Sequence, residues 1–561
     1  MGAIGFASNH KKRSSHPMRR HSLAFVSALG LVLATPYPSS AETAPAIGAD
    51  AIRADIGFLA DDLLEGRDAG TRGYDIAARY VAARFEALGL LQVIPDSWYQ
   101  PVTLAVARLD KASAPSISIG GRRFANGEDI AIGAFGREPR QSMEAQAVFV
   151  GYGLKSDREK IDDYAGLDLK GKFAVALSGA PAGMPSEIGA HLAAEKSLAA
   201  QQAGAVGLIT IPTASYLGRT PWEKIRDRAQ HPSASWVARD GQPYVRTPAI
   251  RGTATVTGAA ADALLAGSGK SLAAIRAQAE RKGARPRGFA LQPTVRIDRT
   301  SIVETAPSRN VLAVLPGADP ALSHEYVLLM AHLDHLGMEE NGKGPDRVYN
   351  GAMDNASGIA TLLAVARAFA ESGERPRRSI LFAAVTAEED GLLGSQYLAK
   401  NPVLPAGGRL VGVINLDMPI LTYDFHDVIA FGADHSTLGP IAEKAARAQG
   451  ISLSPDPLPA EGLFTRSDHY RFVQEGVPAL FLLTGFAGPG REAFEHFLKT
   501  DYHQLSDQMS LPFNWDAAAK FARVNYAIAR EIADEPRAPR WYKGDFFGDA
   551  FAPDAPKATK P

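Results

Sequence analysis

The stretch "YVLLMAHLDHLG", residues 326–337, joins an apolar run to a group of histidine and aspartate side chains. A near-continuous apolar run is typical of a strand that is buried on both faces of a parallel sheet. Three similar runs follow along the chain: "SILFAAVT" (379–386), "LVGVINL" (410–416) and "ALFLLTG" (479–485). An amphipathic helix is expected between the first two runs, over 356–373, where Gly373 would end it. This alternation predicts an α/β fold with a mostly parallel central sheet flanked by helices.

Polar side chains follow three of these predicted strands directly. The first strand leads into "HLDH", the second into "AEED" and the third into "DM". In open α/β sheets, binding sites form in the crevice beyond the carboxyl ends of the strands. We therefore expect these histidine, aspartate and glutamate side chains to lie together at one edge of the sheet.

The residue types favour a metal centre. The chain has no cysteine, so metal ligands must come from histidine and carboxylate side chains. Three carboxylates and two imidazoles suit two divalent ions that share one carboxylate, and such a ligand set suits Zn²⁺, with Co²⁺ or Mn²⁺ as alternatives. The five proposed ligands are His332, Asp354, Glu389, Asp417 and His503.

Some neighbouring side chains are alternatives to these ligands. His335 competes with His332, because it stands at the other end of the same short segment. His469 and His496 compete with His503, and Asp390 extends the acidic run that contains Glu389.

Composition restricts the classes of partner. The chain has 561 residues, of which 46% are apolar, and its 60 basic residues nearly cancel its 61 acidic residues. This balance gives no electrostatic reason to expect binding to nucleic acid or to an anionic membrane. The length predicts more than one folded unit.

The N-terminus has the pattern of a signal peptide over residues 1–41. Basic residues precede the apolar run "SLAFVSALGLVLA" (22–34), and small residues suited to cleavage after Ala41 follow it. This run has 13 residues, fewer than the roughly 20 that a membrane-spanning helix needs. The pattern predicts export to the bacterial periplasm or the extracellular space, with no membrane span after cleavage. Met18 is an alternative start.

The rest of the chain divides into four segments. Residues 42–144 begin with two helices joined by a Gly-rich turn, and 145–295 read as a small inserted α/β domain without a catalytic cluster. Residues 296–535 contain the predicted catalytic sheet, and 536–561 have the composition of a flexible tail.

Five motifs occur in an order that resembles one family. They are "AHLDHLG" (331–337), "NGAMDNASG" (350–358), "TAEEDGLLGS" (386–395), "NLDM" (415–418) and "DYHQLSD" (501–507). This series is similar to that of the di-zinc aminopeptidase family, which includes secreted bacterial aminopeptidases and relatives of glutamate carboxypeptidase. The inserted segment resembles the protease-associated domain that many members carry at this place.

The resemblance implies a role for each motif. His332, Asp417 and His503 would each bind a zinc ion, and Asp354 would bridge both ions. Glu389 would be a further ligand, whereas the adjacent Glu388 would be the general base.

The resemblance also implies supporting residues. Asp334 would orient His332, and Asp507 would hold His503. Tyr502 would hydrogen-bond the developing oxyanion, Arg466 would contact the substrate, and Asp468 would be structural.

The predicted function is that of an exported zinc-dependent aminopeptidase, which removes N-terminal residues from peptides with a metal-activated water and a glutamate base. A carboxypeptidase or glutaminyl-cyclase-like enzyme on the same fold is an alternative, and an inactive binding ectodomain is a further one. The sequence predicts neither the preferred side chain nor the oligomeric state.

Overall fold

The computed structural model describes residues 47–339, 342 and 344–561. The predicted signal peptide, including Met18, lies outside the described residues.

The central sheet has four parallel neighbouring strands, as the apolar runs predicted. Their order is β14-β13-β15-β18, and β13 lies in the middle with all eight of its residues buried. Their bounds are β13 (Glu325–His332), β14 (Ser379–Val385), β15 (Arg409–Leu416) and β18 (Ala479–Thr484). Beyond β18 lie β16 (Asp427–Phe431), which is antiparallel to it, and then β17 (Ser452–Ser454). The predicted α/β class with a mostly parallel sheet is confirmed.

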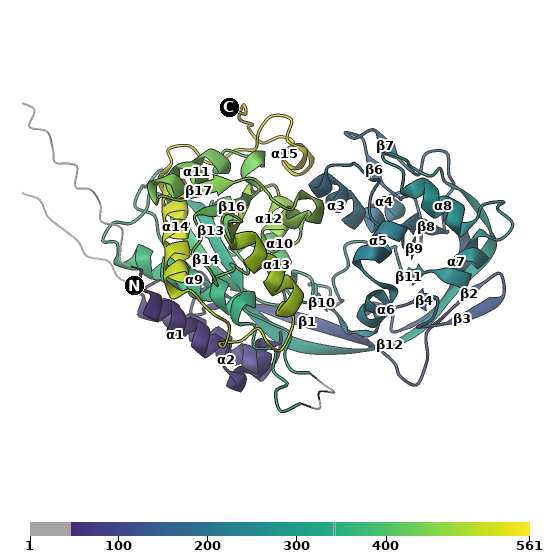
Figure 1. Cartoon of the computed structure of the whole chain (residues 1–561), viewed down its shortest axis with the longest axis horizontal. Coiled ribbons are helices and arrows are strands. Elements are labelled where there is room, and N and C mark those ends of the chain that lie inside the picture. Colours follow the sequence, from purple (N-terminus) through teal and green to yellow (C-terminus); the bar gives the residue numbers. More distant parts are fainter. Residues whose placement is uncertain (1–46, 340–341, 343) are drawn as a thin grey trace, which may run out of the picture. The chain divides into compact units, whose positions relative to one another are not determined.

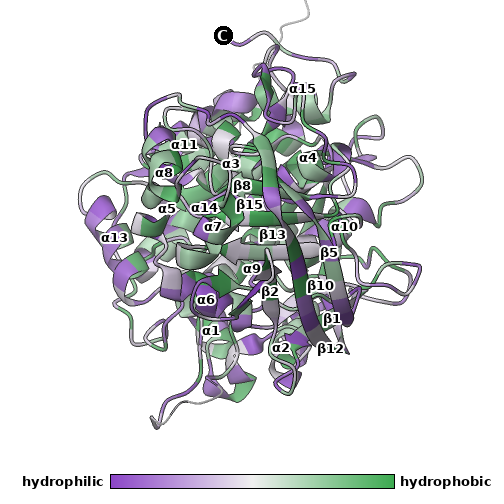
Figure 2. Ribbon diagram, turned by 90° about the vertical axis from the view of Figure 1, so that its right-hand side faces the viewer, coloured by the Kyte–Doolittle hydropathy of each residue, from purple (hydrophilic) through white to green (hydrophobic). Residues whose placement is uncertain are grey.

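Helices cover this sheet. α9 (Ser357–Glu371) and α14 (Trp515–Asp534) pack on each other and on β13, while α1 (Ala49–Leu59) packs on both helices. α11 (Leu438–Ala448) packs on α14; α12 (His469–Val473) contacts β15 and β18, and α10 (Leu393–Lys400) packs on α12. In Figure 1 the strands lie between the α9–α14 pair and the α10–α12 pair. Figure 2 shows the apolar character of β13 and β15 against the polar surface of α13 (Gly490–Thr500).

The N-terminal segment forms the two expected helices, α1 and α2 (Arg72–Ala87), with Gly89 just beyond the second. Between them lies the short helical turn η1 (Asp62–Arg67), in which Gly66 has a positive φ of 69°. A Cβ at Gly66 would lie 2.1 Å from the carbonyl oxygen of Gly337, so glycine is required for this close approach to the loop after β13.

One long strand runs from the inserted segment into the catalytic sheet. β12 (Phe289–Leu315) has 27 residues, and its C-terminal end pairs with β14. Its middle pairs antiparallel with β1 (Tyr99–Leu109). β10 (Ser233–Trp236) pairs with the other edge of β1. Its first half pairs with β2 (Ser116–Ile119) and β5 (Arg140–Phe149).

The remaining strands of the inserted sheet follow β5 in the order β8-β9-β11-β4. Their bounds are β8 (Phe173–Leu177), β9 (Gly207–Ile211), β11 (Gly252–Val256) and β4 (Ile130–Ala131), with β3 (Arg122–Ala125) beside β2. β6 (Lys155–Ser156) and β7 (Ile161–Asp162) form a separate pair. The sheet therefore takes in strands from before residue 145, which the sequence-based division placed in the catalytic part. That boundary was misplaced because pairing partners far apart in the chain, not a local break, define the sheet.

Six helices accompany the inserted sheet: α3 (Ser186–Ala194), α4 (Lys196–Gln202), α5 (Ala214–Arg219), α6 (Trp222–Gln230), α7 (Gly258–Leu265) and α8 (Leu272–Ala279). α3 and α4 follow each other directly and meet at Glu195.

The C-terminal segment is folded, which corrects the expectation of a flexible tail. Trp541 and Tyr542 are buried, and α15 (Phe546–Phe551) places Phe547 in the core. The side chain of Asp545 lies 2.6 Å from Nδ1 of His435, and the other ring nitrogen of His435 lies 3.0 Å from Glu187 of the inserted segment. Composition alone missed this because four aromatic residues anchor an otherwise polar segment.

None of the helices within the described residues is long and apolar enough to cross a membrane.

Candidate metal centre

Three neighbouring strands bring the predicted side chains together. His332 is the last residue of β13, Glu388 and Glu389 follow β14, and Asp417 follows β15 directly. Because β13 is hydrogen-bonded between β14 and β15, the carboxyl ends of the three parallel strands are adjacent. This is the crevice in which an α/β sheet places its site.

Asp354 lies between the two histidines. It belongs to the helical turn η2 (Ala352–Ala356) that leads into α9. Its Oδ1 is 3.2 Å from Nε2 of His332, and its Oδ2 is 3.3 Å from Nε2 of His503. One carboxylate therefore faces both imidazoles, as a bridging ligand would.

Each histidine also faces a second carboxylate. Nε2 of His332 is 3.2 Å from Oδ1 of Asp417, and Nε2 of His503 is 3.1 Å from Oε2 of Glu389. The site thus has two halves, each with one histidine and one outer carboxylate, and Asp354 is common to both.

Left-handed backbone conformations accompany this convergence. Ala387, Met418 and His503 have φ values of 53°, 50° and 58°, a region that costs energy for residues other than glycine and that is enriched at functional sites. Ala387 stands immediately before the glutamate pair. The ligand atoms of Glu388, Glu389 and His332 lie within 4.8 Å of one another, so the bend at Ala387 aims two adjacent side chains at one site.

Asp334 holds the backbone of the glutamate pair. Its two carboxylate oxygens accept the N–H groups of Glu388 and Glu389 at 3.1 and 3.2 Å. Its carboxylate is 4.0 Å from Nδ1 of His332, and that nitrogen is 3.2 Å from the backbone carbonyl of Asp334 instead. Because a carbonyl only accepts, Nδ1 carries a hydrogen, and Nε2 is the ring nitrogen that faces Asp354 and Asp417. The carbonyl of Asp334 therefore contacts His332, whereas its carboxylate holds the backbone of the glutamate pair.

Asp507 supports Asp354 and not His503, which corrects the sequence-based expectation. Its oxygens accept the N–H groups of Met353 and Asp354 at 2.8 and 3.0 Å. Asn355 fixes the other side of the turn, because its amide donates to the carbonyl of Leu416 and its Oδ1 accepts the N–H of Met418. These bonds tie η2 to the end of β15, where Asp417 stands.

Three supporting residues were missed from the sequence or ranked too low. His335 places Nδ1 2.8 Å from Oε1 of Glu389, and Ser467 places its hydroxyl 2.5 Å from Oδ2 of Asp417. Arg67 is fully buried and donates to the carbonyls of Leu333, Asn350 and Gly351, which lie on the two loops that carry His332 and Asp354, as well as to that of Leu59. Only "HLDH" and the Gly-rich segment around Arg67 gave any signal in the sequence.

Burial and neighbouring charges shift the pKa values of the two glutamates in opposite directions. Burial raises the pKa of Glu388 well above its usual range, and the nearby Glu389 and Asp417 add to this effect against the opposing charge of His332. Burial and the charge of Asp354 act to raise the pKa of Glu389, but its hydrogen bonds to His335 and His503 outweigh them and lower this pKa to about 2. Burial lowers the pKa of His503, but the carboxylates of Asp354 and Glu389 outweigh it and raise the pKa to about 10.

Other predicted residues lie outside this cluster. The guanidinium of Arg466 is 3.5 Å from Glu461 and its side chain is 56% exposed, although the next residue, Ser467, contacts Asp417. The ring of Tyr502 stacks on His503 with a centroid distance of 3.8 Å.

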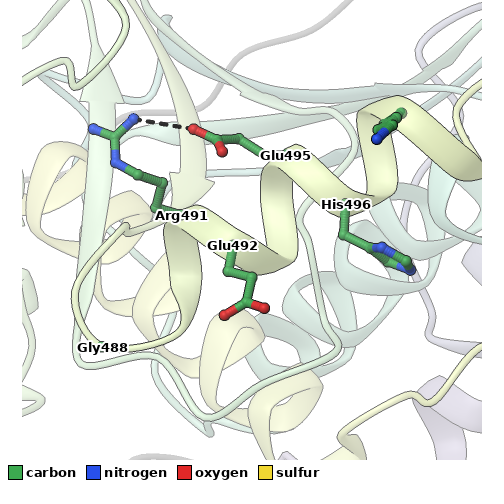
Figure 3. A pocket seen from close by; sticks show the side chains of 6 residues that line it. Gly488, Arg491, Glu492, Glu495 and His496 are labelled. Atoms are coloured by element: carbon green, nitrogen blue, oxygen red, sulfur yellow. Dashed lines mark hydrogen bonds and ion pairs between the residues drawn. The ribbon is translucent and has the colours of Figure 1, made fainter.

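Of the alternatives to the proposed ligands, some lie away from the cluster and one lies within it. His496 lies on α13, where with Arg491, Glu492 and Lys499 it lines a surface cavity of about 420 Å³ (Figure 3). His469 is buried among Phe464 and Phe481. Asp468 is fully buried, and neither of its carboxylate oxygens has a hydrogen-bond partner of good geometry among the described residues. Burial raises the pKa of Asp390 to about 6. His335 alone among the alternatives reaches the cluster.

The donor set fits divalent metal ions. Nε2 of His503 is buried and makes no hydrogen bond of good geometry with a described residue, although two carboxylate oxygens lie within 3.3 Å of it. Nε2 of His332 likewise faces two carboxylates. Such contacts are favourable when a proton or a metal ion lies between the two groups, and nitrogen with carboxylate oxygen is a ligand set that zinc accepts.

Comparisons with known proteins agree with this arrangement. The sheet and its histidine–carboxylate cluster define an α/β protein with a candidate metal centre at the carboxyl ends of its parallel strands. Residues 310–529 match the model of peptidase family M28, in agreement with the resemblance that the motif series carries.

Two curated relatives and one solved structure illustrate the similarity. The chain is 28% identical over 278 residues to leupeptin-inactivating enzyme 1 of Streptomyces exfoliatus, with 45% of this chain and 55% of the relative covered. It is 29% identical over 242 residues to aminopeptidase Y of Saccharomyces cerevisiae, with 42% and 40% covered. The chain therefore spans about half the length of these relatives. An aminopeptidase structure from Aneurinibacillus sp. strain AM-1 superposes with a TM-score of 0.51 at 22% identity, covering 88% of this chain and 95% of the other, which shows the shared fold.

Proposed function

We propose that this protein is an exported, zinc-dependent aminopeptidase that hydrolyses the N-terminal peptide bond of peptides. The observation that carries the proposal is the position of Asp354, whose two oxygens face His332 and His503 at 3.2 and 3.3 Å. The names of the relatives, which include aminopeptidases and zinc metalloproteases, support the same class of activity.

The ligand set would hold two zinc ions, with Co²⁺ or Mn²⁺ as substitutes. His332 and Asp417 would hold one ion, His503 and Glu389 the other, and Asp354 both. Three carboxylates leave one net positive charge on two divalent ions. When bound, two such ions polarise a carbonyl group and lower the pKa of a water molecule between them.

Glu388 would move the proton. Its carboxylate lies beside His332 and Glu389, with ligand atoms within 4.8 Å of one another, and its backbone is held by Asp334. The carboxylate would take the proton of the attacking water and return it to the leaving amine, as a general base and then a general acid. With Glu388 as the base, the adjacent Glu389 would act as a metal ligand.

Tyr502 would contribute a hydroxyl for the developing oxyanion, because it stacks on His503 beside the cluster. Arg466 would contact the peptide from the loop that ends in Ser467.

The inserted segment would control access of peptides. α3 contacts the loop formed by η4 (Pro459–Glu461) and η5 (Leu463–Thr465), which immediately precedes Arg466. Nδ1 of His191 on α3 is 2.6 Å from the hydroxyl of Tyr470 just beyond it. Contacts of this kind let the insertion set the position of the loop that borders Asp417, in line with its resemblance to a protease-associated domain.

The test combines activity with metal content. The purified chain without residues 1–41 should hydrolyse aminoacyl-nitroanilides, lose this activity with a chelator and regain it with Zn²⁺, while N-acetylated versions of the same substrates stay intact. Elemental analysis should approach two metals per chain. Hydrolysis of N-blocked peptides from the carboxyl end would favour the carboxypeptidase alternative, and turnover that survives complete metal removal would refute the proposal.

A further inference from the structure

We propose that His335 and Ser467 are a matched pair of positioning residues that each hold the outward oxygen of an outer carboxylate, so that Glu389 and Asp417 offer one oxygen each to the metals. This inference rests on the proposed function, because it concerns how the same site binds divalent cations.

The first half of the pair is His335 with Glu389. Oε1 of Glu389 is 2.8 Å from Nδ1 of His335, and its Oε2 is 3.1 Å from Nε2 of His503. The two oxygens of this carboxylate therefore have different partners. Because an ionised carboxylate only accepts, the hydrogen of the imidazole is on Nδ1.

The surroundings of His335 indicate that its role is to hydrogen-bond Glu389. Its side chain is fully buried, and its Nε2 has no hydrogen-bond partner within the described residues. A Cβ at Gly351 would lie 2.6 Å from the ring, so the glycine leaves the space that the imidazole occupies. A buried imidazole with one unpaired nitrogen costs stability, and its bond to Glu389 is the contact that explains why the site contains it.

The second half is Ser467 with Asp417. Oδ1 of Asp417 is 3.2 Å from His332, and its Oδ2 is 2.5 Å from the hydroxyl of Ser467. The amide of Asn415, near the end of β15, donates to the same hydroxyl at 2.6 Å. With its oxygen accepting from Asn415, the hydroxyl directs its own hydrogen to Asp417. In both outer carboxylates, one oxygen thus faces a histidine of the site and the other accepts from a supporting donor, although the two donors come from separate parts of the chain.

This arrangement has a consequence for each metal separately. A carboxylate with a free outer oxygen can rotate or bind through both oxygens, whereas one held by a donor presents a single oxygen in a fixed direction. Loss of His335 should therefore weaken the ion beside His503, and loss of Ser467 should weaken the ion beside His332. Removal of such supporting bonds typically lowers metal affinity by about 10–100-fold.

The test measures stepwise Zn²⁺ affinity by competition with a chromophoric chelator, together with the visible absorption of the Co²⁺-loaded protein. The variants are His335→Ala and Ser467→Ala, with His335→Asn and Ser467→Thr as conservative partners that keep a donor. Ser379→Ala is the matched control, because Ser379 is buried and hydrogen-bonded but lies at the other end of β14 from the cluster.

Each alanine variant should bind two Zn²⁺ ions, one about 10–100-fold more weakly than wild type, and the Co²⁺ absorption should change in intensity. The conservative variants should recover most of the affinity, and the Ser379→Ala control should match wild type. Wild-type affinity in both alanine variants would overturn the inference while leaving the proposed function intact. Loss of one whole equivalent in both His335→Ala and His335→Asn would overturn it as well, because His335 would then be a ligand. Wild-type protein that binds no Zn²⁺ would instead refute the proposed function itself.

Discussion

Replacement of Glu388 by glutamine separates the base from the ligands. Glutamine has the size of glutamate and can still form hydrogen bonds, but it cannot accept and return a proton. The backbone should stay in place, because Asp334 holds the N–H groups of residues 388 and 389 whatever side chain residue 388 carries. The bend at Ala387, with φ at 53°, lies outside the substituted residue.

The size of the effect follows from this role. General acid–base assistance is worth about 10²–10⁴-fold, so kcat should fall by that factor, or about 3–5 kcal/mol of activation free energy. Metal content should stay near that of wild type. Glu389→Gln should behave differently, because both oxygens of Glu389 are engaged, and an amide NH₂ facing His503 or His335 would replace an acceptor by a donor. That variant should lose metal before it loses turnover per bound metal.

The assay is steady-state hydrolysis of an aminoacyl-nitroanilide, with elemental analysis of the same dialysed samples. If Glu388→Gln sheds metal and Glu389→Gln retains it, the assignment of the pair is reversed. If Glu388→Gln keeps near-normal kcat with tightly bound metal, another residue is the base and the mechanism is wrong.

Three further predictions concern the frame around the site. Arg67→Met should lower the thermal midpoint of the metal-free protein strongly, because the buried carbonyls that accept from Arg67 would lose their donor, and each buried group left unsatisfied costs about 1–3 kcal/mol. Arg72, whose side chain is 72% exposed, is the control: Arg72→Met should change the midpoint little, and equal midpoints would contradict the bracing role of Arg67. Burial lowers the pKa of His435, but Asp545 and Glu187 outweigh it and raise the pKa to about 9, so its stabilisation is complete below the unfolded value of about 6.5, on the order of 3 kcal/mol, and is lost as the pH rises through 9. The difference in thermal midpoint between wild type and His435→Gln should therefore shrink from pH 6 to pH 10, and a constant difference would refute the shift. Removal of the inserted sheet together with the matching part of β12 should change KM or size selectivity more than kcat if the core folds, and finding a ligand or proton donor within it would contradict its role in access.

The sequence predicted the parts of the site that are encoded locally. Each of three apolar runs ends directly in its ligand segment, so the parallel sheet itself brings His332, Glu389 and Asp417 together. Asp354 was predictable because a Gly-rich turn placed it just ahead of an amphipathic helix. The ligand types followed from the absence of cysteine.

The supporting contacts were not predictable, because they join residues far apart in the chain. Arg67 reaches the carbonyl of Leu333, 266 positions away, and Ser467 reaches Asp417 across 50 positions. The contact that gives His335 its role is with Glu389, which lies 54 positions later in the chain, so the sequence around His335 does not distinguish it from a solvated histidine. Asp507 stands four residues from His503, and that proximity suggested the wrong partner, since its oxygens accept N–H groups at 353 and 354.

The limits of the larger units were missed for the same kind of reason. β12 continues without interruption through 27 residues, so no local signal marks where the inserted sheet ends and the catalytic sheet begins. The C-terminal segment looked mobile by composition, but Trp541 and Phe547 find an apolar surface that only the folded chain provides.

The central claim is that Asp354 bridges two metal ions, and an anomalous difference map from crystals of the zinc-loaded protein tests it most directly. Two zinc peaks are expected about 3.5–4 Å apart, one beside His332 and Asp417 and the other beside His503 and Glu389, with one oxygen of Asp354 on each. A single peak in fully active protein, or two peaks of which only one contacts Asp354, would contradict it.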